Sequence, residues 1–284
     1  MTVGRALRDA AANLGEQGAA EARSVAELLL AEVLACPPLE LPLHAEDELP
    51  AEQGRALAEL VRRAAAGLPV QYVLGKTEFM GHVFRVDPRV LIPRPDTERL
   101  VELVLACPPL RRRPRPVIVD VGTGSGCIVI SLALGRAGPE YQGVDVSADA
   151  IRLARENAAY LGVAGRITFR VGDLLAAAAP GSVDAVVANL PYIRRADLAG
   201  LPRHIRDHEP RAALDGGADG LDLIRRLAPQ AWTALRPGGF LFLEIGCDQG
   251  AAARGLLEQA GFTNVRVEQD LGRRDRVVWG HKAR

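Results

Sequence analysis

The chain has 284 residues, of which 48% are apolar, and its 35 acidic side chains balance its 35 lysines and arginines. This length favours two domains, while the zero formal net charge gives no field that would attract a polyanion, so we expect no direct contact with nucleic acid. Because no apolar stretch approaches the ~20 residues that span a bilayer, and the charged amino terminus lacks the apolar centre of a signal peptide, we expect a soluble, cytoplasmic protein without membrane contact.

The first part of the chain has helical texture. Apolar residues recur three and four positions apart over 2–14, 21–35 and 51–67, which predicts three helices and a small helical domain over 1–72. Residues 73–92 then carry Phe79, Val83 and Val86 between turn residues, which predicts a short hairpin that links this domain to a second one over 93–284.

The second domain alternates strand-like and helix-like segments. We expect strands over 116–122, 141–147, 166–173 and 183–193, with helices over 127–137 and 149–162 between them. Further on, strands over 238–246, 263–270 and 275–280 and a helix over 249–261 are expected, and the last two strands can pair antiparallel. This alternation is typical of an α/β fold with a mostly parallel, Rossmann-like sheet covered by helices on both faces.

A glycine-rich loop follows the first of these strands. "VIVDVGTGSGCIVI" places Gly122, Gly124 and Gly126 between a strand and a helix, where glycines let the backbone approach a ligand closely. The spacing GxGxG lacks the later glycine of the dinucleotide fingerprint GxGxxG. By itself this loop indicates a nucleotide-like ligand and no more.

Two carboxylates stand at the ends of the next strands. Asp145 follows the glycine loop by about 20 residues and can accept both hydroxyls of a ribose, and Asp173 can face the amino group of a base. Taken singly, either residue could instead cap a helix. Together they favour an adenosine site. The missing pyrophosphate glycine and a later apolar strand that ends in Asn-x-Pro-Tyr favour S-adenosylmethionine over a nicotinamide cofactor. The predicted cofactor-binding residues are Gly122, Thr123, Gly124, Ser125, Gly126, Asp145, Val146, Asp173, Leu174 and Asn189.

The four cysteines give no sign of a metal site. Cys36, Cys107, Cys127 and Cys247 are scattered, with no CxxC pair and no accompanying histidines. We therefore expect reduced, structural thiols and no bound metal.

The sequence resembles the peptide chain release factor glutamine methyltransferases, the PrmC/HemK family. The similar segments occur in the family's order and include "VLIPRPDTE", "DVGTGSGCIVISLAL", Asn-Leu-Pro-Tyr at 189–192, "HEPRAALDGG", "RPGGFLFLEIGCDQG" and "DLGRRDRVVWG". "VLIPRPDTE" and "HEPRAALDGG" are distinctive, whereas GxGxG occurs in many methyltransferases. The resemblance implies a class I methyltransferase sheet with a small amino-terminal helical domain.

The resemblance also implies the reaction. Such an enzyme methylates the side-chain amide nitrogen of the glutamine in the Gly-Gly-Gln loop of class 1 release factors. An amide nitrogen is a poor nucleophile, so two acceptors on its N–H bonds would orient it and stabilise its developing positive charge. The oxygen of Asn189 and the carbonyl of Leu190 can be those acceptors, and the ring of Tyr192 can exclude water. The predicted catalytic residues are Asn189, Leu190, Pro191 and Tyr192, which with Arg94 are also predicted to bind substrate.

Leu190 departs from the family pattern, which has proline at both central positions. The carbonyl survives this change but the fixed torsion of proline is lost, although Pro191 still restrains the residue before it. We therefore expect a less firmly held carbonyl and an incidental side chain at this position.

Two further blocks have more than one interpretation. Similarity to the family places Arg94, Asp96 and Glu98 at the mouth of the active site, but Asp96 or Thr97 could equally cap a helix. "HEPRAALDGG" could form a wall near the substrate, or His208, Glu209 and Arg211 could form an ion-pair and capping cluster, while Glu244 ends a strand and should be buried with a partner.

Two other functions stay open at this stage. One is methylation of the exocyclic amine of adenine or guanine in nucleic acid, since that planar nitrogen chemistry uses similar motifs. The other is a nonenzymatic protein that binds the cofactor but has lost turnover through Leu190.

Overall fold

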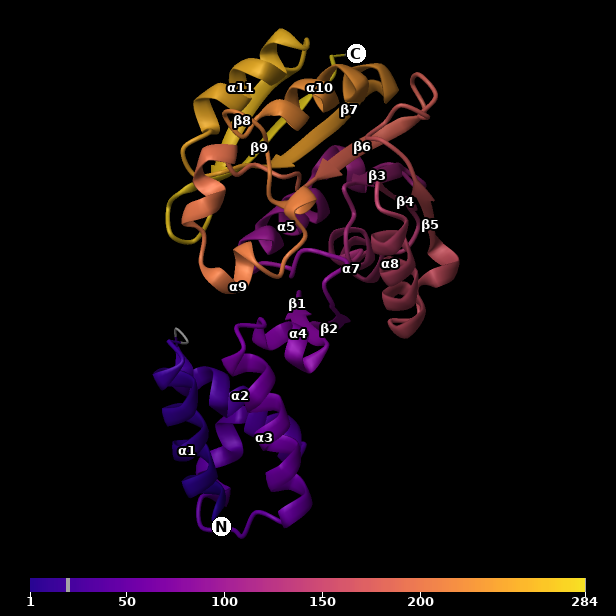
Figure 1. Ribbon diagram of the computed structural model, residues 1–284. Coiled ribbons are helices and arrows are strands. Elements are labelled where there is room, and N and C mark those ends of the chain that lie inside the picture. Colours follow the sequence, from indigo (N-terminus) through magenta and orange to yellow (C-terminus); the bar gives the residue numbers. More distant parts are fainter. Residues whose placement is uncertain (19–20, 284) are drawn as a thin grey trace. The chain divides into compact units, whose positions relative to one another are not determined.

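The computed structural model describes residues 1–18 and 21–283. They form two compact units, one made of Met1–Lys76 with Pro202–His208 and the other of Thr77–Leu201 with Glu209–Arg284. In Figure 1 the first unit is drawn mainly in indigo, and the second runs from magenta to yellow.

The first unit is helical. The three predicted helices are confirmed as α1 (Val3–Glu16), α2 (Ala22–Leu34) and α3 (Ala51–Ala65), and leucines from α1 and α2 fill its core. The structure adds short helices that the sequence pattern did not predict, because a few residues give too little periodicity. These are η1 (Pro38–His44), α4 (Val70–Leu74) and α9 (Arg203–Arg206).

The predicted hairpin is confirmed by β1 (Lys76–Phe79) and β2 (His82–Arg85). Met80 and Gly81 between them both have positive φ, at 52° and 71°, as a two-residue type I′ turn requires. Phe79 and Phe84 are buried edge to face with ring centroids 6.1 Å apart, whereas Val83 is 41% exposed. The inward residue of the second strand is therefore Phe84 and not Val83.

The second unit is built on a sheet of seven strands in the order β5-β4-β3-β6-β7-β9-β8. The first five strands in that order pair in parallel, and β9 is antiparallel to both of its neighbours, as expected for the last strands. The strands are β3 (Val117–Val121), β4 (Glu140–Asp145), β5 (Ile167–Val171), β6 (Val183–Ala188), β7 (Leu235–Glu244), β8 (Thr263–Gln269) and β9 (Asp275–His281).

Helices cover both faces of this sheet, so the predicted Rossmann-like α/β fold is confirmed. One core cluster joins a sheet face to α5 (Glu98–Ala106), α7 (Cys127–Gly135) and α8 (Ala148–Tyr160), and a second joins the opposite face to α10 (Asp222–Ala234) and α11 (Gly250–Gln259). Helix α10 was not predicted, because Pro229 in its interior argues for a break. The remaining short helices are η2 (Pro95–Thr97), α6 (Pro108–Arg111), η3 (Ala164–Arg166), η4 (Arg195–Gly200) and η5 (Arg211–Ala213).

The strand order places a crevice beside β3. The chain moves from β3 outward to β4 and β5, and then returns to the other side of β3 with β6. Ligands of open α/β sheets bind outside the carboxyl ends of the strands at such a reversal. The glycine loop follows β3 and Asn189 follows β6, so both flank this point.

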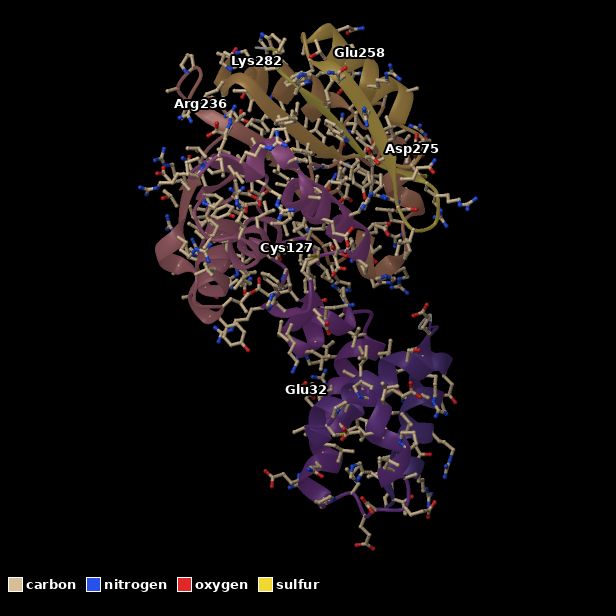
Figure 2. All side chains as sticks on the ribbon, turned by 180° about the vertical axis from the view of Figure 1, so that it is seen from behind. Glu32, Cys127, Arg236, Glu258, Asp275 and Lys282 are labelled. Atoms are coloured by element: carbon tan, nitrogen blue, oxygen red, sulfur yellow. The ribbon has the colours of Figure 1, made fainter. Side chains whose placement is uncertain are left out.

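A buried carboxylate holds together the amino-terminal ends of the central strands, at the sheet edge opposite the glycine loop. Asp184 lies at the start of β6, and its side chain accepts hydrogen bonds from Val117 N at 2.8 Å, from Arg236 at 2.9 Å and from Arg113. Figure 2 labels Arg236 near Lys282, whose ammonium donates to the Trp232 and Leu235 carbonyls beside it. This network ties β3, β6 and β7 together at the end of the sheet away from the glycine loop.

Replacing Asp184 with alanine should strongly destabilise the second unit. Removing one partner from a buried ion pair leaves the other charges uncompensated, so the free energy of unfolding should fall by about 3 kcal/mol. Denaturation by urea, followed by circular dichroism, measures this change.

The matched control is Glu258→Ala on α11, labelled in Figure 2, because this carboxylate forms an exposed ion pair with Arg254. Exposed pairs contribute little, so the control should change stability by less than about 0.5 kcal/mol. Equal stability of the two variants would show that the Asp184 network does not hold the sheet.

Candidate functional site

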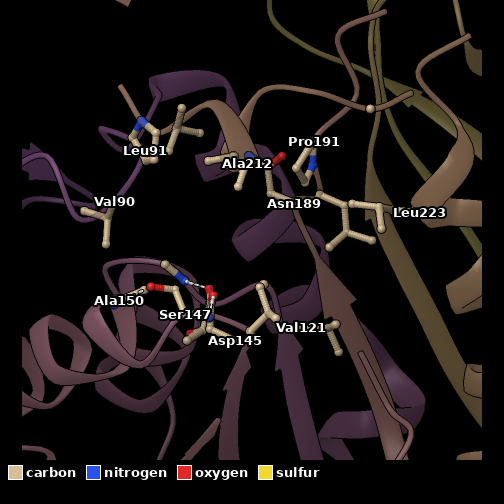
Figure 3. Close-up of a pocket in the computed structure, with 18 of the residues that line it drawn as sticks. Val90, Leu91, Val121, Asp145, Ser147, Ala150, Asn189, Pro191, Ala212 and Leu223 are labelled. Atoms are coloured by element: carbon tan, nitrogen blue, oxygen red, sulfur yellow. Dashed lines mark hydrogen bonds between the residues drawn. The ribbon is translucent and has the colours of Figure 1, made fainter. Parts of the chain in front are cut away.

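A cavity of about 760 Å³ lies at the carboxyl ends of the central strands. Figure 3 shows Asp145, Ser147 and Ala150 on one wall and Asn189, Pro191 and Ala212 on the facing wall. Most of the predicted residues line it, but Gly126 and Tyr192 are not among the described residues that do. The predicted residues on its walls are Arg94, Gly122, Thr123, Gly124, Ser125, Asp145, Val146, Asp173, Leu174, Asn189, Leu190 and Pro191.

The glycine loop has a backbone that other residues would not tolerate. Gly122 has φ of 73°, and a Cβ atom there would lie 3.0 Å from a methyl carbon of Leu190. Gly126 has φ of 82°, and a Cβ atom there would lie 2.8 Å from Ile130. Both glycines are therefore required by the conformation and by space, because neighbouring side chains pack directly against them.

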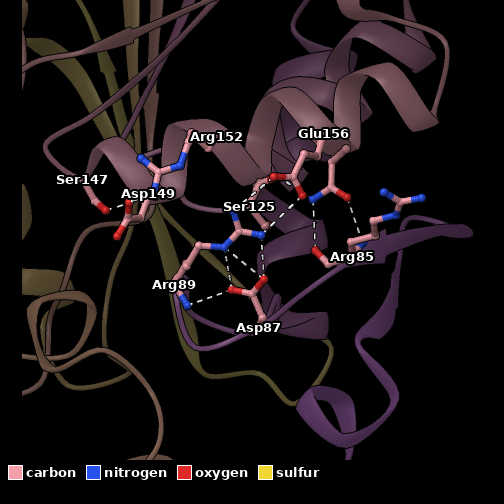
Figure 4. Close-up of polar contacts among 10 residues, drawn as sticks. Arg85, Asp87, Arg89, Ser125, Ser147, Asp149, Arg152 and Glu156 are labelled. Carbon is pink, nitrogen blue, oxygen red and sulfur yellow. Dashed lines mark hydrogen bonds and ion pairs between the residues drawn. The ribbon is translucent and has the colours of Figure 1, made fainter.

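The fully buried Asn157 fixes this loop from behind. Its amide nitrogen donates to the carbonyls of Ser125 and Arg85, at 2.9 and 3.0 Å, and its oxygen accepts from Arg85 N at 2.8 Å. Figure 4 shows Arg85 and Ser125 in this region, beside Arg89, whose guanidinium lies between Asp87 and Glu156. Strand β2 is thus tied to the loop, and Arg89 reaches the cavity wall with its charge compensated.

Asp145 has a structural role in addition to its place on the wall. One carboxylate oxygen accepts from Gly124 N and the other from Ser147 N, each at 2.9 Å. A carboxylate has about four acceptor positions, so two remain for a ligand. Its predicted contact with a ribose stays a prediction that this geometry allows.

Asp173 is an exposed residue on the rim. Its carboxylate pairs with Arg226 of α10 at 2.6 Å, and Leu174 beside it is buried with φ of 51°. The neighbour Arg226 also lines the cavity and was not predicted. A base amino group would share the Asp173 carboxylate with this arginine.

Asp120 lies under the loop and is fully buried. Thr123 Oγ1 donates to one of its oxygens at 2.6 Å, and the other oxygen has no partner among the described residues. Burial raises the pKa of this carboxyl to about 7, and the Thr123 hydroxyl offsets only part of that effect. Near neutral pH the residue therefore holds a proton for part of the time.

Asn189 follows directly after β6, and its amide is half-buried. Its nitrogen donates to Thr97 Oγ1 at 3.1 Å, so its oxygen is the end that can accept a hydrogen bond from a ligand. Thr97 is a candidate helix cap by sequence, but its side chain makes no capping hydrogen bond at the start of α5. The tertiary contact with Asn189 replaces that role.

The side chain of Leu190 is not incidental to the fold. It is 5% exposed and belongs to the core cluster that includes Val121 and Leu243. It also lies against Gly122, as the space available there shows. Burial of this side chain restrains the backbone that proline would otherwise fix.

Tyr192 is held from both of its ends. Its hydroxyl donates to Glu244 Oε1 at 3.3 Å, and its carbonyl accepts from Gln249 Nε2 at 3.0 Å. Burial, and then the Glu244 charge, raise the pKa of Tyr192. The tyrosine therefore stays neutral, and it is not among the described residues that line the cavity.

Arg94 is paired within the protein. Its guanidinium donates to the buried carboxylate of Glu209 at 2.5 Å, and the other carboxylate oxygen accepts from Ile92 N at 3.2 Å. Glu209 of the "HEPR" block thus forms an ion pair with Arg94, whereas the predicted cluster joined it to His208 and Arg211. Arg94 can still reach a substrate, because it lines the cavity.

Two family models match the chain. The PrmC N-terminal domain matches residues 5–75 and a methyltransferase domain matches residues 114–244. A release factor glutamine methyltransferase of Moorella thermoacetica is 46% identical over 99% of both chains, and one of Cereibacter sphaeroides is 42% identical over 98% of both chains.

The chain belongs to the release factor glutamine methyltransferase family. This confirms the predicted resemblance and makes the protein an S-adenosylmethionine-dependent methyltransferase. A crystal structure of a methyltransferase from Pyrococcus furiosus has a TM-score of 0.54 at 16% identity, and covers 81% of this chain and 98% of its own. That similarity supports the fold alone.

The residues present fit the family's cofactor, S-adenosylmethionine. The cavity has the size of typical small-molecule sites, about 300–1,000 Å³. Gly124 leaves open space, because a Cβ atom there would approach the Gly122 oxygen only to 4.0 Å, and Asp145, which accepts from Gly124 N, has free acceptor positions.

Two other features of the structure bear on its chemistry. Within residues 1–18 and 21–283, no group of three or more His, Cys, Asp and Glu side chains is placed to hold a metal ion. In the same part of the chain, no helix is long and apolar enough to span a bilayer.

Replacing Asp120 with asparagine should change how stability depends on pH. The unfolded carboxyl, with a pKa of 3.8, loses its proton at lower pH than the folded one at about 7. Stability of the unchanged protein should therefore fall as the pH rises between these values, because the folded state binds the extra proton. Relative to it, Asp120→Asn should gain at least about 1 kcal/mol between pH 5 and pH 8 in denaturant titrations.

Asp149→Asn is the matched control, because this carboxyl is exposed on α8 and pairs with Arg152. Its difference from the unchanged protein should not follow that trend. A difference for Asp120→Asn that is the same at both pH values would show that Asp120 is ionised throughout.

Proposed function

We propose that the protein transfers a methyl group to the side-chain amide nitrogen of the glutamine in the Gly-Gly-Gln loop of class 1 release factors, in support of translation termination. The observation that carries this proposal is the orientation of Asn189. Because its nitrogen is occupied by Thr97, its oxygen is available for an N–H of the substrate amide. The names of the relatives support the choice of substrate.

The loop after β6 offers two acceptors for one amide nitrogen. The oxygen of Asn189 can take one N–H, and the carbonyl of Leu190 can take the other. This pairing would hold the nitrogen in one orientation and stabilise positive charge as it develops there. A loop anchored by the buried Leu190 side chain keeps these acceptors in place.

The glycine loop and the two strand-end carboxylates would hold the cofactor. When bound, S-adenosylmethionine supplies a methyl group on a positively charged sulfur. Gly124 leaves room for it, Asp145 can accept the ribose hydroxyls, and Asp173 can face the base. Because the amide nitrogen becomes acidic as it gains the methyl group, solvent can take its proton and no strong general base is needed.

The remaining residues would bind the release factor and shield the reaction. Tyr192, held through its hydroxyl by Glu244, would keep water from the amide. We propose Arg94 as a contact to the substrate on the cavity wall. The helical domain over 1–72 would bind the body of the release factor, the segment 73–92 would link it to the catalytic domain over 93–284, and the reaction would take place in the cytoplasm.

Methyl transfer from labelled cofactor should mark a class 1 release factor but not its variant with alanine in place of the Gly-Gly-Gln glutamine. Asn189→Ala should lower kcat by about 100-fold or more, because one of two charge-stabilising contacts is lost. Scintillation counting with release factor, its alanine variant, DNA and RNA measures both effects.

The choice of methyl-accepting substrate in that assay separates a release factor methyltransferase from the alternative functions. Label on DNA or RNA would favour an amino-group methyltransferase of nucleic acid. Undiminished label on the alanine variant would place the modified residue elsewhere in the release factor. Either result would overturn the proposal.

Replacing Leu190 with proline should change kcat only slightly. The substitution exchanges the restraint by the buried leucine side chain for the fixed torsion of proline, so kcat should change by less than about threefold. Single-turnover kinetics at saturating cofactor provide the measurement. A large rise in rate would show that the Leu190 carbonyl is loosely held despite the buried side chain.

A further inference from the structure

Two buried polar side chains lie beside the Asn-Leu-Pro-Tyr loop, and one of them, Thr97, also lines the cavity. Thr97 and Glu244 are each 2% exposed, which is unusual for such residues without a defined role. Thr97 ends η2, and Glu244 ends β7 next to β6, where Ala188 and Leu243 are in register. Strand pairing therefore brings Glu244 to the same sheet edge as Asn189.

The orientation of the Asn189 amide depends on Thr97. A primary amide has a donor end and an acceptor end of nearly equal shape. If the amide turned by 180°, its NH₂ group would face the cavity and would oppose the N–H of a substrate amide. The hydrogen bond from Asn189 Nδ2 to Thr97 Oγ1, at 3.1 Å, holds the orientation that presents the oxygen.

Glu244 can set the direction of the Thr97 hydroxyl in turn. The hydroxyl lies near enough to the Glu244 carboxyl to lower the pKa of that group. An ionised carboxylate can only accept a hydrogen bond, so it would direct the single Thr97 proton to itself and leave the threonine oxygen to accept from Asn189. The same carboxylate accepts from the Tyr192 hydroxyl at 3.3 Å through Oε1, while Oε2 has no close partner among the described residues.

We propose that Thr97 and Glu244 are positioning residues: the Glu244 carboxylate, through the Thr97 hydroxyl, fixes the Asn189 amide with its oxygen toward the substrate, and directly holds the Tyr192 hydroxyl. One buried carboxylate thus orients both ends of the Asn-Leu-Pro-Tyr loop. This inference rests on the proposed function, because it assigns the orientation of the acceptor that the substrate amide needs.

The charge of Glu244 provides a readout of this arrangement. Burial raises the pKa of this carboxyl to about 7, and the contacts with Thr97 and Tyr192 offset part of the effect. Once protonated, the carboxyl could donate to Thr97 and free the threonine proton to point at Asn189, which favours the turned amide. Other charged groups also act on Glu244. Arg276 of β9 lowers the pKa of its carboxyl, and Asp96 of η2 raises it. The thiol of Cys127 on α7 also interacts with this carboxyl.

The decisive test compares Thr97→Val with Thr97→Ser. Valine keeps the shape but removes the hydroxyl, and kcat with a release factor should fall roughly 10- to 100-fold, as expected when a reacting group is misplaced. Serine keeps the hydroxyl and should retain kcat within about threefold. The Kd for S-adenosylmethionine and the midpoint of thermal unfolding should stay close to those of the unchanged protein, and Thr233→Val on α10 is the matched control.

A double-mutant cycle separates positioning from simple loss of structure. If Thr97 acts through Asn189, then Thr97→Val should lower kcat by less than about twofold when Asn189 is already alanine. A loss of equal size in both backgrounds would overturn the proposal. So would a kcat for Thr97→Val within threefold of the unchanged protein.

Glu244→Gln tests the carboxylate itself. The kcat of the unchanged protein should rise with pH through about 7 as Glu244 ionises, and this rise should disappear in the variant. A rise that persists in Glu244→Gln would exclude Glu244 as its source. If this variant does not fold, the Thr97 series and the double-mutant cycle still decide the proposal.

Failure of the proposed function would give a different result. If the unchanged protein labels nucleic acid and not the release factor, the substrate assignment fails. The Thr97 and Glu244 variants would then be assayed with nucleic acid as the methyl acceptor. For any planar amine held by Asn189, Thr97→Val should lower kcat by the same factor, and Thr97→Ser should retain it.

Discussion

The parallel pairing of β3 with β6 is the constraint on which the site depends. Val121 and Ala188 are partners in this register, so the glycine loop and the Asn-Leu-Pro-Tyr loop leave neighbouring strands at the same edge. Leu190 then packs against Gly122, which joins the glycine loop to the Asn-Leu-Pro-Tyr loop. A shift of this register would separate the two loops and would turn each side chain of β6 to the opposite face of the sheet.

Buried carboxylates have different roles at the two ends of the sheet. Asp184 fastens the amino ends of the central strands through two arginines, which is a structural role. Asp120 and Glu244 lie at the carboxyl ends, where burial raises the pKa of each to about 7. Such perturbed groups are costly for stability and are common at functional sites. Their position beside the cavity agrees with this tendency.

Much of the architecture followed from local pattern. The alternation of apolar runs predicted the sheet, and the end of β4 at Asp145 and of β7 at Glu244 agreed with it. Helix α10 was not predicted because Pro229 interrupts its pattern, and Phe84, the buried residue of β2, was not singled out because the strand register decides which side chains face inward. The contacts of Thr97 and Glu209 gave no local signal, since their partners Asn189 and Arg94 are about a hundred residues away.

The sequence by itself determined the fold class, the glycine loop and the family, because these depend on residue types at fixed short spacings. Tertiary structure alone decided which end of the Asn189 amide faces the cavity, that the Leu190 side chain is buried, and that Tyr192 is held by Glu244. Such features depend on which groups meet across separate strands and helices. Hydrogen-bond direction and burial depend on contacts between distant segments, so the spacing of residues within one segment does not predict them.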